Sequence, residues 1–176
     1  LRKSNLPPRM EKKSFQKRLT HEQALVKIRH YCAFQERTHI EVKTKLAGMG
    51  IGWSDVNEIV SKLIEDGYLN EERFARAFVG GKYRMKGWGK KKIEAELKKK
   101  GVSSYSIQKA IREEIDLIDY EKTLSKIMKK KWLSIKGQGI TTYVKQAKTR
   151  QYLLSRGYEN AAISKAMKEI LEEEKN

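Results

Sequence analysis

The sequence is poor in cysteine, in proline and in long apolar runs. Its one cysteine, Cys32, excludes a disulfide within the chain and is typical of a protein in a reducing compartment. No apolar segment approaches the roughly 20 residues that a membrane-spanning helix requires, and the basic segment at residues 1–13 lacks the apolar centre of a secretion signal. We therefore expect a soluble, cytoplasmic protein without a membrane partner. A basic protein at a membrane surface stays open as an alternative, but no segment combines a basic face with a strong exposed apolar one.

Residues that usually carry catalysis are also scarce. The three histidines, His21, His30 and His39, all lie near the start of the sequence, and none has the spacing to Cys32 that a zinc site requires. A single cysteine on the apolar face of a helix is typically a small core residue. The Gly87–Lys90 segment lacks the spacing of a phosphate-binding loop. We expect no catalytic residue, no metal and no cofactor.

Positive charge is what the sequence has in excess. It contains 39 Lys and Arg against 22 Asp and Glu, which gives a formal net charge of +17. Residues 82–100 carry nine cations and two acids, and residues 122–150 carry nine cations and no acid. Lysine runs are usually solvated helix faces, but these are interleaved with Tyr83, Trp88, Trp132 and Tyr143. The surplus favours a polyanionic partner, such as nucleic acid or a protein assembly that contains it.

A repeat organises the chain. When the sequence is aligned on three glycines, a leucine stands four residues before each of them, and apolar residues stand six and ten residues after each. Eight residues before the glycine, Val42 and Ile93 correspond, but Thr149 does not. Any helical protein places glycines after leucine-containing helices, but three coincidences at fixed offsets favour a true repeat. The aligned residues are Gly50, Gly101 and Gly157, with Leu46, Leu97 and Leu153 before them.

The repeat predicts an all-α fold of three tandem three-helix units that form an elongated, curved array. We expect a flexible basic arm at residues 1–18, unit 1 at residues 19–66, unit 2 at residues 67–116 and unit 3 at residues 117–176. No alternating β-branched run indicates a sheet.

Helix-start signals support the first unit. Thr20-His21-Glu22-Gln23 and Thr38-His39-Ile40-Glu41 both have the form of a capping box, and Trp53-Ser54 starts a third helix. In the first helix we expect Leu25, Ile28, Tyr31 and Cys32 to be buried. The third helix carries one apolar stripe, formed by Val56, Ile59, Val60, Leu63 and Ile64.

Residues 67–102 carry the motifs of a known family. The matching segments are Gly67-Tyr68-Leu69-Asn70-Glu71-Glu72-Arg73-Phe74-Ala75, Lys86-Gly87-Trp88-Gly89, Lys92-Ile93-Glu94-Ala95-Glu96-Leu97 and Lys99-Lys100-Gly101-Val102. Here the sequence resembles the RecX regulatory proteins of bacteria, and Arg37–Leu46 fits the family pattern approximately. Glu71 stands where the family usually has Asp. Lys92 replaces the usual Arg, which removes the planar guanidinium from that position.

The resemblance implies a regulatory protein, not an enzyme, that acts in DNA recombination, DNA repair and the SOS response, and we expect a monomer. Such a protein binds the filament of RecA recombinase on single- or double-stranded DNA and inhibits its ATPase, strand-exchange and co-protease activities. We expect Lys90, Lys91 and Lys92 to lie on an exposed face. The expected contact residues for recombinase or DNA are Arg73, Arg76, Lys82, Tyr83, Arg84, Lys86, Trp88, Lys90, Lys91, Lys98, Lys99, Lys129, Lys130, Lys131, Lys145, Lys148 and Arg150.

Two other functions remain open at this point. Charge and helical units alone would also suit a DNA-binding protein that acts without a recombinase partner, whose affinity falls steeply with salt. An RNA-associated helical repeat protein is disfavoured, because the sequence shows no base-stacking platform and no repeat-wise recognition code.

Overall fold

The computed structural model describes residues 19–173. Within this range it contains nine α-helices and no strand, so the predicted all-α fold is confirmed. The predicted arm at residues 1–18 lies outside the described residues. The helices are α1 (His21–Phe34), α2 (His39–Gly48), α3 (Trp53–Glu65), α4 (Glu71–Lys86), α5 (Lys90–Lys99), α6 (Ser104–Glu114), α7 (Leu117–Ser134), α8 (Thr142–Ser155) and α9 (Asn160–Glu173).

Local side-chain caps fix where the helices begin. Both predicted capping boxes are present: the Thr20 hydroxyl accepts from the Gln23 amide at 3.3 Å, and the Thr38 hydroxyl accepts from the Glu41 amide at 3.1 Å. The Asn70 side chain accepts from the Arg73 amide at 2.8 Å and starts α4. Each cap gives a partner to an amide that the first turn of a helix leaves unpaired.

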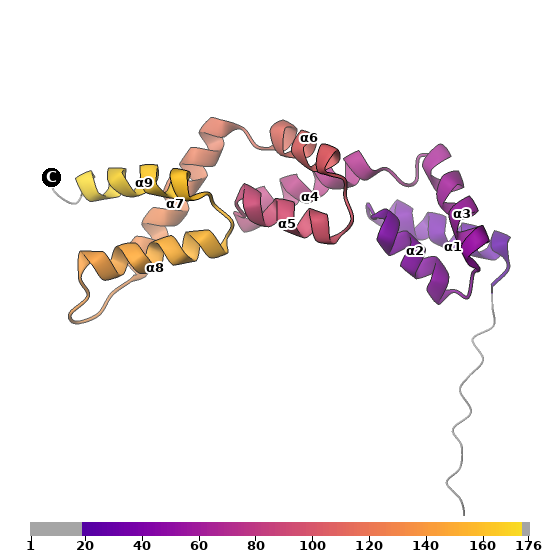
Figure 1. Ribbon diagram of the computed structural model, residues 1–176, viewed down its shortest axis with the longest axis horizontal. Helices are drawn as coiled ribbons and strands as arrows, with labels where there is room; N and C mark the ends of the chain where they lie inside the picture. The colour runs from indigo at the N-terminus through magenta and orange to yellow at the C-terminus, as the bar shows by residue number, and fades with distance from the viewer. Residues whose placement is uncertain (1–18, 174–176) are drawn as a thin grey trace, which may run out of the picture.

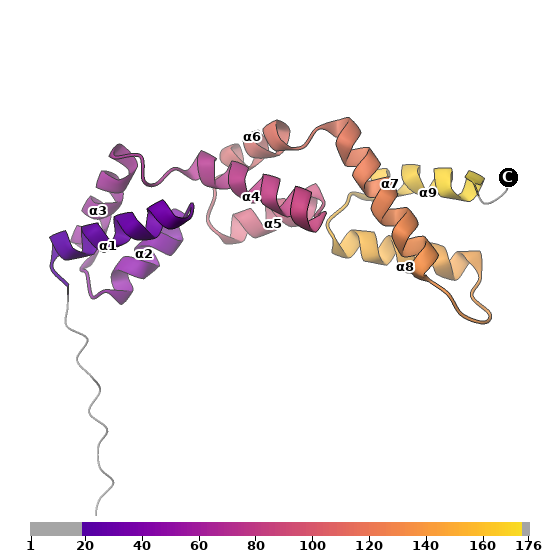
Figure 2. The same ribbon diagram turned by 180° about the vertical axis from the view of Figure 1, so that it is seen from behind.

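The helices form three groups in chain order. Helix pairs with extensive contact lie within α1–α3, within α4–α6 or within α7–α9. Figure 1 shows these groups one after another along the long axis of the molecule, and the view from behind in Figure 2 shows the same order. The predicted elongated array of three three-helix units is therefore confirmed. The residue boundaries that we assign to the units stay a prediction.

The repeat positions form the cores of the units. Leu46, Leu97 and Leu153 are fully buried, and so are Ile107 and Ile163, which stand six residues after the aligned glycines. A leucine at the same place in each middle helix therefore belongs to a hydrophobic core. Burying a leucine side chain stabilises the fold by about 1.5–3 kcal/mol.

In unit 1 the predicted buried face of the first helix is partly wrong, and the apolar stripe of the third helix is not buried across its whole width. Ile64 is 47% exposed, while the other four residues of its stripe are buried. Leu25 and Tyr31 are only half-buried, and Ala24 joins Ile28 and Cys32 in the core instead. Each helix of a three-helix unit has only two neighbours, so the outermost part of an apolar stripe faces solvent. Burial raises the pKa of the Cys32 thiol, as is typical of a core cysteine.

Units 2 and 3 share one hydrophobic core, and unit 1 has its own. The shared core runs from Phe74 in α4 to Ile170 in α9 and includes three neighbouring tyrosines, Tyr83, Tyr120 and Tyr158. Their ring centroids lie 6.1 Å apart for the first pair and 5.2 Å apart for the second. Units 2 and 3 therefore behave as one packed body.

Main-chain hydrogen bonds reinforce the joint between units 2 and 3. The Gly89 amide donates to the Arg156 carbonyl at 2.8 Å, and the Lys91 amide donates to the Gly157 carbonyl at 3.1 Å. The positive start of α5 thus meets the negative end of α8, which is a favourable arrangement of two helix dipoles. A Cβ added to Gly89 would lie 2.3 Å from the Gly157 carbonyl, so this approach requires glycine.

The joint between units 1 and 2 is mainly polar. Glu36 pairs with Arg73 at 2.5 Å, and Glu41 pairs with Lys100 at 2.8 Å. Apolar contact comes from Ile40, whose Cδ1 atom lies 2.3 Å from where a Cβ on Gly101 would be, and from Leu69, which precedes α4 and is buried in the core of unit 1. Unit 1 is therefore held to the rest of the array by ion pairs, by these apolar contacts and by the chain itself.

Candidate partner-binding surface

The predicted contact residues lie on α4, α5, α7 and α8, and the structure divides them into groups. Four lysines are exposed and make no ion pair within residues 19–173: Lys86, Lys91, Lys130 and Lys148. Their charges are uncompensated, so these four lysines are the best candidates for contact with a polyanion.

A second group of cations pairs with acids on the surface. Examples are Arg76 with Glu113 at 3.7 Å and Arg84 with Glu114 at 3.0 Å. Exposed pairs of this kind contribute only about 0.2–1 kcal/mol, so a phosphate or a partner carboxylate can compete for the cation. The other members are Arg73 with Glu36, Lys98 with Glu94, Lys99 with Glu96 and Lys129 with Glu173.

A third group of cations covers aromatic rings. The Lys82 ammonium lies 5.2 Å from the ring centroids of both Phe78 and Trp88, and Lys90 lies 4.5 Å from that of Tyr120. Lys131 lies over Tyr152 and Lys145 over Trp132, at 5.2 Å and 5.3 Å. The basic and aromatic residues that are interleaved in the sequence therefore have complementary places: the rings pack into or against the core, and the cations lie above them.

Tyr83 is not available to an external partner. Its side chain is buried, and its hydroxyl donates to the Asp119 carboxylate at 2.6 Å, which ties α4 to α7. Burial and this hydrogen bond raise the pKa of Tyr83 to about 12. Trp88 is half-buried against the shared core, and Arg150 donates to Ser164 at 3.0 Å, which ties α8 to α9.

The expectation that Lys90, Lys91 and Lys92 share an exposed face is wrong for two of the three. Lys91 is exposed, but Lys90 and Lys92 are half-buried. The Lys92 ammonium donates to the Ser155 carbonyl at 3.3 Å and lies over the Trp88 ring. These lysines occupy the first turn of α5, which packs against the end of α8. Unit 3 therefore covers part of the Lys90–Lys92 segment.

The structure brings together cations that the sequence keeps far apart. A groove of about 440 Å³ between the end of α4 and α7 is lined by Arg84, Lys86, Lys126 and Arg156, with Asp119 as its one acid. We call the groove that these four residues line the cationic groove. Lys126 was not among the predicted residues, although it lies in the segment 122–150, which contains no acid, four residues from Lys122.

Arg156, in the same groove, also has a structural role. Its guanidinium donates to the carbonyls of Gly87 and Lys86, which the last turn of α4 leaves unpaired. Gly87 itself has a φ of 58°, in the left-handed region, and ends α4. Arg156 therefore fixes the position of Lys86 beside α7.

Residues 19–173 contain no group of three or more His, Cys, Asp and Glu side chains that could hold a metal ion. Among the helices described here, none combines the length and the apolar character needed to span a membrane. The surface offers cationic contacts and apolar grooves.

Comparison with known proteins identifies the family. Models of the second and third three-helix domains of RecX match residues 70–111 and 119–167, which together are just over half of the chain. The chain belongs to the RecX family. Regulatory protein RecX of Bacillus cereus (strain AH820) and that of Bacillus anthracis (strain A0248) are each 27% identical to it over 143 residues. These matches cover 81% of this chain and 52% of each relative, so the chain spans about half the length of these curated relatives.

Solved RecX structures share the fold. The crystal structure of RecX from Lactobacillus salivarius superposes with a TM-score of 0.76 at 24% identity, over 85% of this chain and 95% of the other. A second crystal structure, of a regulatory protein RecX, gives a TM-score of 0.74 at 18% identity, over 82% and 70%. At these identities the likeness supports the RecX arrangement of helices and says nothing of individual contact residues.

The residues that carry the RecX motif have structural roles in this chain. Asn70 caps α4, and the Glu71 carboxylate accepts from the Ser103 and Ser106 hydroxyls at 2.6 Å and 2.7 Å, which holds α6 against α4. Gly89 and Lys92 form the joint with unit 3. The motif therefore specifies the geometry of the array, while the uncompensated lysines lie mostly outside it.

Proposed function

We propose that this chain is a non-enzymatic regulator that binds the RecA recombinase filament on DNA and inhibits its ATPase, strand-exchange and co-protease activities. The observation that carries the proposal is RecX family membership, established by the match of units 2 and 3. The physical support is an extended array whose second and third units expose Lys86, Lys91, Lys130 and Lys148.

The proposed mechanism is electrostatic attraction followed by a steric block. The uncompensated lysines attract the array to acidic protein surface and to DNA phosphates, which speeds association at low salt. Because units 2 and 3 share one core, they act as a stiff element that reaches across neighbouring recombinase protomers. A stiff element in that position opposes the growth of the filament and the motions of its subunits.

The direct test uses recombinase filaments assembled on single-stranded DNA. Adding the chain at well below one copy per protomer should slow ATP hydrolysis, because one bound array touches several protomers. The rate is measured at fixed salt and fixed DNA concentration. An unchanged ATPase rate over the full titration would contradict the proposal.

The uncompensated cations also favour a second candidate, a DNA-binding protein that acts without a recombinase partner. This candidate predicts that affinity falls steeply with salt and is the same for bare and recombinase-coated strands. A titration of both strands at one salt concentration separates the two functions. Tighter binding to the coated strand supports the regulator, and equal binding supports the second candidate.

Charge reversal tests the contact surface itself. Lys86→Glu combined with Lys126→Glu should weaken filament binding about tenfold, because two exposed attractions become repulsions. The matched control is Arg112→Glu with Lys168→Glu, which changes the same charge at two exposed positions away from the cationic groove. Binding is measured by fluorescence anisotropy, and helix content by circular dichroism. If both double variants weaken binding equally, net charge alone acts and the groove has no specific role.

A further inference from the structure

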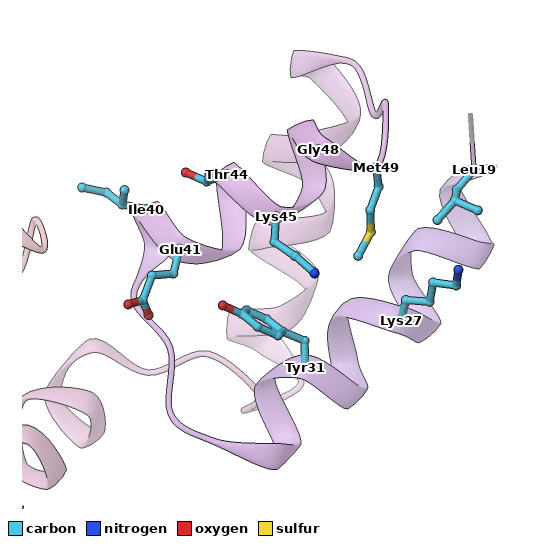
Figure 3. A pocket seen from close by; sticks show the side chains of 9 residues that line it. All are labelled: Leu19, Lys27, Tyr31, Ile40, Glu41, Thr44, Lys45, Gly48 and Met49. Atoms are coloured by element: carbon cyan, nitrogen blue, oxygen red, sulfur yellow. The ribbon is translucent and has the colours of Figure 1, made fainter. Parts of the chain in front are cut away.

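A second groove lies in unit 1, the part of the chain that neither RecX domain model matches. It has a volume of about 670 Å³ and lies between α1 and α2. Figure 3 shows the two helices on either side of it, with Tyr31 and Lys27 contributed by α1, Lys45 by α2, and Met49 at the end of α2. None of the contact residues predicted from the sequence lies here.

The walls of this groove are mainly apolar. The apolar side chains in the lining are Leu19, Tyr31, Ile40 and Met49, and the groove is open at the surface. Tyr31 forms the middle, with the Arg37 guanidinium 4.0 Å from its ring centroid. An uncovered apolar hollow of this size commonly marks a site for a partner's side chains.

The rim of the groove is positively charged. Lys27 and Lys45 are both exposed and make no ion pair within residues 19–173, and the Lys45 ammonium lies 5.6 Å from the Tyr31 ring centroid. Glu41 is the one acid in the lining, and its two oxygens already accept from Lys100 and from the Thr38 amide. Because Glu41 already pairs with Lys100, Lys27 and Lys45 leave the groove with a net positive charge.

A glycine keeps one end of the groove open. Gly48 is the last residue of α2, and a Cβ built on it meets no atom within 4 Å. The missing side chain leaves space beside Met49.

We propose that this groove docks an acidic peptide segment of a partner protein that inserts apolar side chains between α1 and α2. The apolar walls would take the side chains, and Lys27 and Lys45 would pair with the flanking carboxylates. The site goes beyond the proposed function, which uses units 2 and 3.

Charge decides against the chain's own first segment as the occupant. Residues 1–18 carry seven Lys and Arg and one Glu, so Lys27 and Lys45 would repel them. A second copy of the chain is the remaining alternative, since α3 carries acids and exposes Trp53. The experiment below distinguishes all three occupants.

The methionines provide the readout. Met49 lies in the groove, Met85 is exposed in a different groove on α4, and Met128 and Met167 are buried. The probe is a short peptide of alternating glutamate and leucine, added to the full chain with ¹³C-labelled methionine methyl groups. We expect the Met49 resonance to shift on titration while those of Met85, Met128 and Met167 stay in place.

Two variants sharpen the test. Lys27→Glu with Lys45→Glu should weaken peptide binding about tenfold, whereas the charge-matched control Lys130→Glu with Lys136→Glu in unit 3 should leave the Met49 response unchanged. Gly48→Leu should fill the open end and abolish the shift without loss of thermal stability, because its Cβ meets no neighbour.

Other results would overturn the proposal. A Met85 response without a Met49 response would place the peptide on α4. Equal or tighter binding of the matching lysine and leucine peptide, or of a peptide of residues 1–18, would exclude an acidic occupant. A Met49 shift that depends on protein concentration alone would identify a second copy, and no Met49 shift with any peptide would exclude docking.

Discussion

At the scale of single residues, the most informative position lies eight residues before the aligned glycine, where the third repeat has a polar residue in place of an apolar one. Val42 and Ile93 occupy this place in units 1 and 2, and both are fully buried. Thr149 takes it in unit 3 and is also fully buried, yet its hydroxyl has no hydrogen-bond partner among the residues that the structure describes. A buried hydroxyl without a partner costs free energy that an apolar side chain of the same shape avoids.

Thr149→Val should therefore stabilise the fold by about 1 kcal/mol, because valine has the shape of threonine without the hydroxyl. The free energy of unfolding in urea measures the effect. The matched control is Thr141→Val, which should lower this free energy because the Thr141 side chain caps α8. If Thr149→Val destabilised the chain, its hydroxyl would have a partner in solution.

At the scale of elements, the joint between α5 and α8 sets the relative position of units 2 and 3. Gly89→Ala should lower the free energy of unfolding by about 1–3 kcal/mol, because the new Cβ would overlap the backbone carbonyl of Gly157, which cannot move aside cheaply. Chemical denaturation followed by circular dichroism measures this change.

The control for this prediction is Gly81→Ala on α4. A Cβ at Gly81 meets no atom within 4 Å, so the same chemical change should raise stability by about 0.4–1 kcal/mol. Equal effects of the two substitutions would mean that units 2 and 3 do not pack through Gly89 in solution.

At the scale of the whole molecule, the two joints differ in kind. An apolar core and main-chain hydrogen bonds hold units 2 and 3 together, and neither depends on pH near neutrality. Ion pairs, together with the apolar contacts of Leu69 and Ile40, hold unit 1 to unit 2. Burial alone would raise the pKa of Glu41, but hydrogen bonds from Lys100 and from the Thr38 amide, together with the nearby positive charges, lower it.

Acid should therefore weaken the joint between units 1 and 2. A carboxylate whose pKa is lower in the folded state stabilises the fold above its ordinary pKa of about 4.3, and this contribution is lost as the pH falls through the folded pKa. Small-angle scattering should show a wider range of molecular dimensions below about pH 4, while circular dichroism still reports folded helices.

Two neutral variants test the cause of this loosening. Glu41→Gln should widen the dimensions already at pH 7, since it removes the charge that pairs with Lys100. Glu96→Gln, which removes a pair within α5 alone, should leave them unchanged. Unchanged dimensions for Glu41→Gln would show that this pair does not set the position of unit 1.

The sequence by itself determined the helices, the three units and the buried leucines, because caps and apolar spacing act between residues that are close in the chain. Thr20, Thr38 and Asn70 mark helix starts without reference to anything distant. Only the tertiary structure decided which cations are available. Lys92 and Tyr83 became parts of a joint, and Lys126 joined Lys86 in a groove, because these outcomes depend on contacts between residues far apart in sequence.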